Sequence, residues 1–465
     1  MIKVTNEQIA EQYRVMRAVR EKNALLEKQP KCFIRTFGCQ QNEADSEQLR
    51  GMAAEMGYSR TDTPEDADLI LVNTCAVREH AELRALSVTG QFKKLKENNP
   101  SLLIGVCGCM VTQEHRMDQV KKSYPYVDFL IGTGMLYRFP EILAAKTGGG
   151  KRSFTVDEAE GSIAEGLPIE RESQTTAWVS VMYGCNNFCS YCVVPYTRGR
   201  ERSRDRADII AEAKAVIASG AKEITLLGQN VNSYRGDVDF ADLVDEICHM
   251  DGDFILRFMT SHPKDASRKL IDTMARNEKC AKQFHLPLQS GSARILREMN
   301  RKYTPESYLA LVDYMREAMP DVAISSDIIV GFPGETEAEF EDTLAMLRRV
   351  EFDMVYSFIY SPRPLTPAAS MECQIPADVK SARFDRLLEV QNEISLKKNL
   401  ALVGRVERVL IIGESKNSSD MLTGRADSNK LVHIPKSSES QALVGKFADV
   451  RITKAETFAL FGELL

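Results

Sequence analysis

Three cysteines on one short loop constrain the fold of this 465-residue chain more than any other feature. Cys185, Cys189 and Cys192 stand in MYGCNNFCSYCVVPY, directly after the apolar strand candidate AWVSVM. This spacing lets one loop wrap three soft thiolates around a single inorganic centre. The neighbouring sequence offers neither a histidine nor another cysteine to complete the tetrahedral set that structural zinc prefers. The loop therefore favours a cubane iron–sulfur cluster with one open iron.

Three further cysteines follow apolar runs nearer the amino terminus. Cys39, Cys75 and Cys109 stand in RTFGCQQNEADSE, LILVNTCAVRE and LIGVCGCMVTQ. Such runs predict parallel strands, whose carboxyl ends meet at one edge of a sheet. Because neighbouring strands lie about 4.8 Å apart, the three loops can converge on one cluster. Taken singly, each is more simply a buried apolar residue, but their shared placement predicts a second three-thiolate site.

The remaining cysteines lack this placement, and we interpret them as structural. Cys107 is the least clear, since in a strand it would point the same way as Cys109. The five are Cys32, Cys107, Cys248, Cys280 and Cys373.

The composition predicts a soluble cytoplasmic protein without a membrane segment. Hydrophobic residues make up 43% of the chain and charged residues 27%, and no apolar run is long enough to cross a bilayer. The first thirty residues lack the apolar core of a secretory signal. Cysteines in a reducing compartment are unsuited to disulfides, so metal binding or burial must account for them.

Apolar runs and helical patterns divide the chain into four segments. Residues 1–30 predict a helical extension, and residues 31–148 predict a parallel α/β domain. In residues 171–400, six strand candidates alternate with helical patterns and predict a partial (βα)6 barrel. Residues 401–465 change to short β-rich pieces, which predict a small antiparallel β-barrel. The fold class is therefore α/β with a terminal β-barrel.

Arginines occupy every second position in PYTRGRERSRDR, just after Cys192. In an extended chain their guanidinium groups would share one face and could follow nucleic-acid phosphates. The alternative is a solvated face paired with Glu201 and Asp205. Because the net charge is −6, any RNA contact must be local. The run comprises Arg198, Arg200, Arg202, Arg204 and Arg206.

These motifs resemble known families. The loop around Cys185 is similar to the radical-SAM superfamily, in which a residue at the place of Tyr191 packs near the adenine of the cofactor. GCQQNEADSE, NTCAVRE and GCMVTQ resemble the three motifs of the methylthiotransferase family, whose first domain holds an auxiliary 4Fe-4S cluster. The last segment resembles the TRAM domain, an OB-like RNA-binding module, where Arg425 and Lys430 are candidate RNA contacts.

LLGQNVNSY, LPLQSGS and SDIIVGFPGET resemble the elements of this family that contact the cofactor. Each of the residues that this implies could equally serve as a turn or capping residue. The resemblance implies that the cofactor or substrate is held by Gln229, Asn230, Ser290, Gly291, Asp327 and Gly331, besides Tyr191.

The resemblance implies a methylthiotransferase that acts on carbon 2 of N6-isopentenyladenosine (dimethylallyladenosine) beside the anticodon of tRNA. Two 4Fe-4S clusters on the six cysteines and two molecules of S-adenosylmethionine would serve the reaction. One cofactor molecule would methylate a sulfur at the auxiliary cluster, and the other would yield the radical. No side-chain acid or base is demanded. The implied partners are tRNA and an electron donor such as a flavodoxin or ferredoxin, and we expect a monomer.

Three alternatives remain open at this point. Family members also act on threonylcarbamoyladenosine of tRNA or on an aspartate of a ribosomal protein. A zinc-binding RNA adaptor is the alternative that is not an enzyme.

One departure from the family is Leu365 in SPRPLTPAAS, where glycine is usual. Leucine resists positive φ, so the turn and any substrate contact at this position are in doubt.

Overall fold

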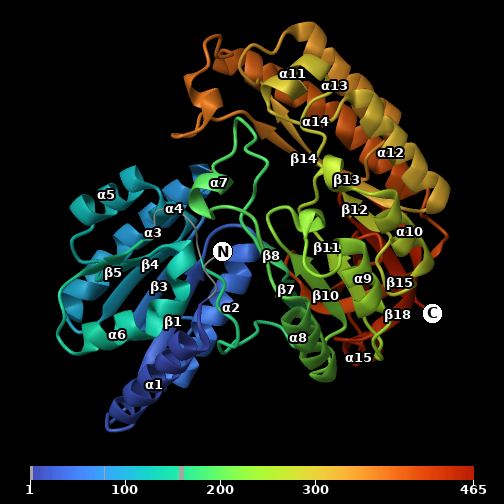
Figure 1. The fold of residues 1–465 in the computed structure, drawn as a ribbon. Helices are drawn as coiled ribbons and strands as arrows, with labels where there is room; N and C mark the ends of the chain where they lie inside the picture. The colour runs from blue at the N-terminus through green and yellow to red at the C-terminus, as the bar shows by residue number, and fades with distance from the viewer. Residues whose placement is uncertain (1–3, 78, 157–161) are drawn as a thin grey trace. The chain divides into compact units, whose positions relative to one another are not determined.

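The computed structural model describes residues 4–77, 79–156 and 162–465 (Figure 1). The chain forms two compact units. The first extends to residue 172 and includes 182–188 and 192–204, and the second comprises 173–181, 189–191 and 205–465. Each described helix is too short or too polar to span a bilayer. The four predicted segments stay a prediction.

A six-stranded parallel sheet forms the centre of the first unit (Figure 1). The strand order is β2-β1-β3-β4-β5-β6. Every residue of β3 is buried, as expected of a strand covered on both faces. The predicted parallel α/β domain is therefore confirmed. The strands are β1 (Lys31–Thr36), β2 (Ser59–Arg60), β3 (Leu69–Thr74), β4 (Leu103–Gly108), β5 (Phe129–Ile131) and β6 (Ser153–Thr155).

Helices enclose this sheet in two apolar cores. One core takes Met16 from α1 and Met52 from α2, and the other takes Phe92 from α3 and Val120 from α5. Thr5 begins α1 in a capping box with the side chain at position 8, so the amino-terminal helix packs as part of this unit. The helices are α1 (Asn6–Asn23), α2 (Gln40–Glu55), α3 (Glu79–Asn98), α4 (Cys109–Thr112), α5 (Glu114–Ser123) and α6 (Phe139–Thr147).

Six parallel strands in chain order form the main part of the second unit. Their sheets are β11-β10-β7 and β12-β13-β14, and backbone hydrogen bonds between Leu256 and both Lys279 and Ala281 connect β11 to the segment leading into β12. The predicted partial barrel is therefore confirmed. The strands are β7 (Thr176–Ser180), β10 (Glu223–Leu227), β11 (Ile255–Phe258), β12 (Gln283–His285), β13 (Ala323–Val330) and β14 (Met354–Ile359).

Helices alternate with these strands, as the sequence pattern predicts. They are α8 (Arg206–Ala218), α9 (Phe240–Cys248), α10 (Arg268–Arg276), α11 (Ala293–Glu298), α12 (Pro305–Ala318), α13 (Glu337–Val350) and α14 (Ala377–Leu400).

A closed five-stranded barrel ends the second unit, in the order β15-β16-β17-β19-β18. Its interior is apolar, with Val409, Leu422 and Val450 fully enclosed. The predicted small barrel is confirmed, although one pair, β17 with β19, is parallel. Its elements are β15 (Val406–Ser415), β16 (Ser418–Ala426), β17 (Leu431–Pro435), α15 (Ser438–Gln441), β18 (Phe447–Ala455) and β19 (Leu460–Leu464).

Candidate functional site

Cys39, Cys75 and Cys109 lie at the carboxyl ends of β1, β3 and β4, three adjacent strands of one sheet. Burial raises the pKa of the Cys109 thiol to about 12; Arg198 opposes this effect, while the Cys75 and Cys39 thiols add to it. The strand β3 pairs with both β1 and β4, and a Cβ added at Gly38 would lie 2.8 Å from Cys75 Cβ, so the loops that carry the three cysteines are close neighbours.

The donor set of this site fits an iron–sulfur cluster. Cys39 is exposed while Cys75 and Cys109 are buried, so the site opens toward solvent at Cys39. Over the described ranges, no three His, Cys, Asp or Glu side chains are spaced to hold a single metal ion. The thiolates of a cubane stand farther apart than the ligands of one ion, and soft sulfur donors suit such a cluster.

Two glycines directly before these cysteines permit the close approach of the loops. Gly38 has φ +142°, and a Cβ there would lie 2.5 Å from Asn42 Oδ1 and 2.8 Å from Cys75 Cβ. Gly108 has φ +95°, and a Cβ there would collide with the Asn73 amide oxygen and the backbone of Thr74. A side chain at either position would therefore push the cysteine loops apart.

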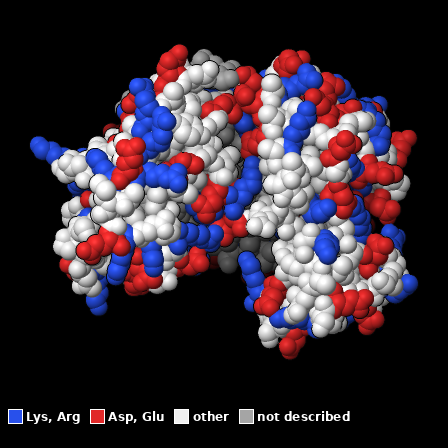
Figure 2. Space-filling view, turned by 90° about the horizontal axis from the view of Figure 1, so that it is seen from below, with Lys and Arg blue, Asp and Glu red and all other residues white. Residues whose placement is uncertain are grey.

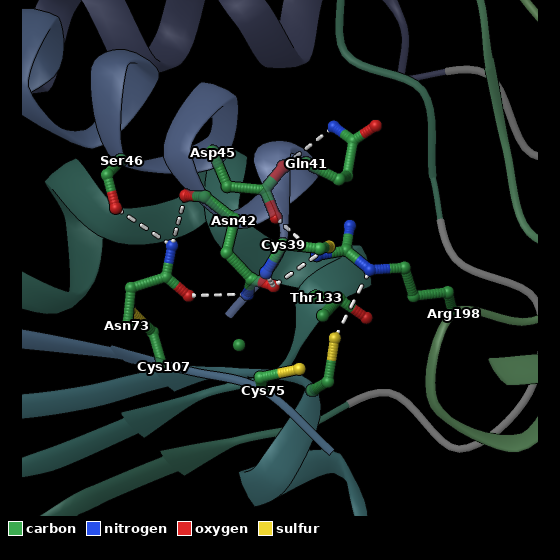
Figure 3. A network of polar contacts seen from close by, with 12 residues as sticks. Cys39, Gln41, Asn42, Asp45, Ser46, Asn73, Cys75, Cys107, Thr133 and Arg198 are labelled. Carbon is green, nitrogen blue, oxygen red and sulfur yellow. Dashed lines mark hydrogen bonds and ion pairs between the residues drawn. The ribbon is translucent and has the colours of Figure 1, made fainter. Parts of the chain in front are cut away.

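Paired asparagines connect helix α2 to strand β3 behind the cysteines (Figure 3). Asn42 Nδ2 donates to Asn73 Oδ1 over 3.2 Å, and Asn73 Nδ2 donates to the Asn42 carbonyl over 2.8 Å and to Ser46 Oγ over 2.9 Å. Sequence reasoning missed these residues. Their signal is spacing, since Asn42 stands three residues after Cys39 and its side chain folds back to the Cys39 amide in a capping box.

Arg198 lies against this site within the first unit (Figure 3). Its Nη2 donates to Asp45 Oδ2 over 2.7 Å and its Nε donates to Cys109 Sγ over 3.2 Å. Burial lowers the pKa of Arg198, but Asp45, Cys109 and Cys39 together raise it well above its ordinary value. The guanidinium therefore stays charged although it is buried.

The second cysteine loop lies between β8 (Met182–Tyr183) and α7 (Val194–Thr197). Cys185 and Cys192 belong to the first unit and Cys189 to the second. In the first unit, the Cys185 amide donates to the Gly199 carbonyl over 3.1 Å, and Val193 packs against Cys109.

Cys189 has its own buried arginine within the second unit. Arg301 Nη1 donates to Cys189 Sγ over 3.4 Å, and its other nitrogens donate to the Pro287 carbonyl and the Tyr303 hydroxyl, both over 2.9 Å. The Ser190 amide donates to the Met299 carbonyl over 3.1 Å. Sequence reasoning missed Arg301, because its sequence neighbours carry no chemical signal. Arg198 was predicted as a phosphate contact, and its place beside Cys109 was not foreseen.

The predicted cofactor residues all lie in the second unit. Tyr191 packs against an apolar cluster that includes Met299 and Phe332. Asn230 is buried, and its Nδ2 donates to Asp265 Oδ2 over 2.9 Å while its Oδ1 has no hydrogen-bond partner among the described residues. Buried acceptors are normally hydrogen-bonded, so the Asn230 Oδ1 is suited to accept a hydrogen bond from a bound cofactor.

The other cofactor candidates make contacts that also suit structural roles. The Gly291 amide donates to Thr343, and the Gly331 amide donates to Glu335 Oε2, both over 2.9 Å. Ser290 Oγ accepts from the Ser292 amide, and Asp327 Oδ2 lies 3.5 Å from the His285 ring. Gln229 is half-buried after β10. Roles for these residues in cofactor binding stay a prediction.

The arginine run does not form the exposed strip that its alternation predicts. Arg198, Arg202 and Arg204 are buried, because the chain turns at α7 before the short strand β9 (Arg202–Ser203). Arg202 donates to the carbonyls of residues 200 and 198, and Arg204 pairs with Glu165 over 2.6 Å. That expectation is therefore wrong for these three.

Arg200 and Arg206 are placed differently from the rest of the run. Arg200 is exposed and stacks over Phe188 with its guanidinium 4.3 Å from the ring centroid. Arg206 pairs with Glu246 and Asp237. A phosphate contact by Arg200 stays a prediction. On the face shown in Figure 2, acidic side chains stand among the basic ones.

Arg425 and Lys430, the two candidate RNA contacts of the terminal barrel, form ion pairs and hydrogen bonds within the second unit. Arg425 Nη1 lies 3.4 Å from Glu223 Oε1 and hydrogen-bonds to Asn429. Lys430 Nζ pairs with Asp353 over 2.9 Å and donates to Asn399 over 2.8 Å. Both side chains therefore join the barrel to the preceding strands, and RNA binding by them stays a prediction.

The departure at position 365 does not remove the turn. Leu365 adopts φ +72° although it is not glycine, and its side chain is exposed, so the solvent accommodates it.

Among the remaining cysteines, Cys107 donates to the Val72 carbonyl over 3.6 Å, away from the Arg198 contact made by Cys109. Cys32, Cys248 and Cys280 are buried and Cys373 is exposed.

Three family models match the chain. The "Uncharacterized protein family UPF0004" covers residues 31–132, the "Radical SAM superfamily" covers 179–347, and the "TRAM domain" covers 400–465.

Two solved structures resemble the chain at low sequence identity and so share its fold alone. The radical S-adenosylmethionine methyltransferase TsrM from Kitasatospora setae has a TM-score of 0.54 and 14% identity, covering 74% of this chain and 77% of its own. The cobalamin-dependent S-adenosylmethionine radical enzyme OxsB has a TM-score of 0.50 and 12% identity, covering 79% and 56%.

Curated relatives match along nearly the whole chain, and each is called tRNA-2-methylthio-N(6)-dimethylallyladenosine synthase. The protein of Thermoanaerobacter sp. (strain X514) is 47% identical over 100% of this chain and 98% of its own. The Acetivibrio thermocellus protein is 48% identical over 100% and 98%, and the Clostridium botulinum (strain Loch Maree / Type A3) protein is 50% identical over 93% and 96%. The chain therefore belongs to the tRNA-2-methylthio-N(6)-dimethylallyladenosine synthase family of radical-SAM proteins.

Proposed function

We propose that this chain adds a methylthio group to carbon 2 of N6-dimethylallyladenosine, beside the anticodon of tRNA. The observation that carries the proposal is the meeting of Cys39, Cys75 and Cys109 at one sheet edge, in a chain about half identical to relatives called by this activity. When bound, 4Fe-4S clusters and two molecules of S-adenosylmethionine would supply the radical and the methylated sulfur.

The two cysteine sets have separate roles in this proposal. Cys39, Cys75 and Cys109 hold the auxiliary cluster, supported by their convergence and by the contact from Arg198. Cys185, Cys189 and Cys192 hold the cluster that binds S-adenosylmethionine, supported by their spacing on one loop.

The groups that hold the cofactor lie at the strand ends of the second unit. Asn230 offers its buried, unpartnered Oδ1 to the cofactor, and Tyr191 offers a ring face next to Cys192. The remaining candidates are Gln229, Ser290, Gly291 and Gly331, which follow strands, and Asp327, which lies within β13. Since adenine carbon 2 must reach the reacting groups, the base has to be splayed out of its loop.

The proposal also assigns the domains of the chain, its RNA contact and its electron donor. Residues 31–148 form the domain of the auxiliary cluster, 171–400 the radical-SAM core and 401–465 the RNA-binding barrel. Arg200 is the member of the arginine run whose exposure supports a phosphate contact. A flavodoxin or ferredoxin supplies electrons, and the protein acts as a cytoplasmic monomer.

The test is methylthiolation in vitro. Anaerobically reconstituted full-length protein is incubated with prenylated tRNA, with threonylcarbamoylated tRNA and with the ribosomal protein, and the products are analysed by mass spectrometry. We expect modification of prenylated tRNA only, and its loss in both Cys39→Ala and Cys185→Ala. Cys373→Ala is the matched control, because this exposed cysteine lies outside both sets and should retain activity. Modified ribosomal protein with unmodified tRNA would contradict the proposal.

A further inference from the structure

A buried ion pair touches one of the auxiliary-site cysteines directly. The side chains of Arg198 and Asp45 are only 6% and 9% exposed, and the same guanidinium donates to Cys109 Sγ over 3.2 Å. Water screens charges at this depth weakly, so a change on either partner acts strongly on groups in contact with the pair.

Asp45 is fixed at both oxygens. Oδ2 accepts from Arg198 and Oδ1 accepts from Gln41 Nε2 over 3.2 Å. Asp45 and Gln41 lie in the first two turns of α2, the helix that begins directly after Cys39. The carboxylate is therefore held in place by the same helix that positions a second cysteine of the site.

We propose that the Asp45–Arg198 pair sets the redox potential of the auxiliary cluster, with Arg198 as a positioning residue that acts through Cys109. The inference rests on the cysteine assignment in the proposed function. A hydrogen bond and a positive charge at a ligating sulfur favour the reduced, more negative cluster and raise its potential. A carboxylate beside that cation offsets part of this effect.

Removing the negative charge and removing the positive charge should therefore shift the midpoint potential of the cluster in opposite directions. Asp45→Asn keeps an oxygen acceptor for Arg198 and removes the negative charge, so the potential rises. Arg198→Met removes the cation and the N–H donor and leaves Asp45 uncompensated, so the potential falls. A pair that only supports the fold would give no such difference in sign.

The experiment uses full-length protein carrying Cys185→Ala, Cys189→Ala and Cys192→Ala, so that only the auxiliary site assembles. After anaerobic reconstitution we measure iron, expecting about four per chain, and the one-electron midpoint potential by a dye-mediated titration followed by EPR. Lys96→Met is the matched control, since it breaks a half-buried pair with Asp128 (2.9 Å) in the same unit; we expect no shift.

The outcomes separate this inference from the proposed function. Shifts of opposite sign, with an unchanged Lys96→Met protein, support the inference. Retained iron with no shift, or with shifts of one sign, overturns the inference alone. Absence of iron from the triple-alanine background overturns the cysteine assignment and the inference together. If the Arg198→Met protein loses its cluster, the Asp45→Asn protein provides the test. A midpoint potential that falls or stays unchanged in Asp45→Asn would contradict the proposal.

Discussion

Leu365 adopts a backbone conformation that leucine rarely takes. Its φ is +72°, and a left-handed conformation costs an ordinary residue roughly 1–2 kcal/mol. Glycine would remove that cost but lose about 0.5–1 kcal/mol through the greater freedom of the unfolded chain. Leu365→Gly should therefore raise the free energy of unfolding by up to about 1.5 kcal/mol. Urea denaturation measures this, with Leu431→Gly in strand β17 as a control that should be destabilised.

Gly108→Ala should remove the auxiliary cluster selectively. The added Cβ would collide with Asn73 and Thr74 directly before Cys109, in a backbone conformation that alanine resists. We expect iron in the reconstituted protein to fall from about eight to about four per chain. Gly149→Ala is the matched control, because φ is also positive there but no atom lies within 4 Å of the added Cβ. Equal iron in the two variants would contradict the prediction.

His262 should make stability depend on pH. Burial lowers its pKa to about 2, with Arg301 and Lys264 adding to the effect, whereas the unfolded side chain titrates near about 6.5. As the pH falls below about 6.5, only the unfolded state binds the proton, so stability decreases. Between about pH 7.5 and about pH 5.5, wild type should lose about 1.4 kcal/mol more than His262→Gln. Parallel denaturation curves for the two proteins would disprove this.

At the scale of elements, a buried arginine joins the terminal barrel to the strands before it. Arg257 pairs with Glu223 over 2.7 Å and donates to the carbonyls of Ala426 and Asp427 over 2.8 Å and 2.6 Å. Both charged side chains are 3% exposed, and breaking such a pair costs roughly 3–5 kcal/mol.

Arg257→Met should therefore destabilise the protein by about 3 kcal/mol or more and make the segment near residue 404 sensitive to proteases. Chemical denaturation and limited proteolysis measure the two effects. Arg405→Met is the control, because Arg405 pairs with Asp321 at the surface, where such pairs contribute about 1 kcal/mol or less. A stability loss no larger than that of the control would show that the barrel is held by other contacts.

The elements themselves follow from local sequence, as β3 illustrates. Its run of LILVNT is apolar enough to require burial on both faces, so the strand is predictable without tertiary information. The arginine run shows the opposite case. Alternation along an extended chain predicts a shared face, but α7 turns the chain and three of its arginines find partners inside the first unit.

For the whole molecule, local sequence was enough to predict the α/β class and the terminal barrel, and it singled out two sets of cysteines as candidate cluster ligands. The strands and helices follow from hydrophobic period, Cys185, Cys189 and Cys192 from their short spacing on one loop, and Cys39, Cys75 and Cys109 from their shared place after apolar runs. The contact between Arg198 and Cys109, 89 residues apart in the chain, could be found only from the folded structure. Arg198 is buried and pairs with Asp45, whereas Arg200, two residues later, is exposed. The two side chains have the same chemistry, so the difference comes from the packing around them, which local sequence does not encode.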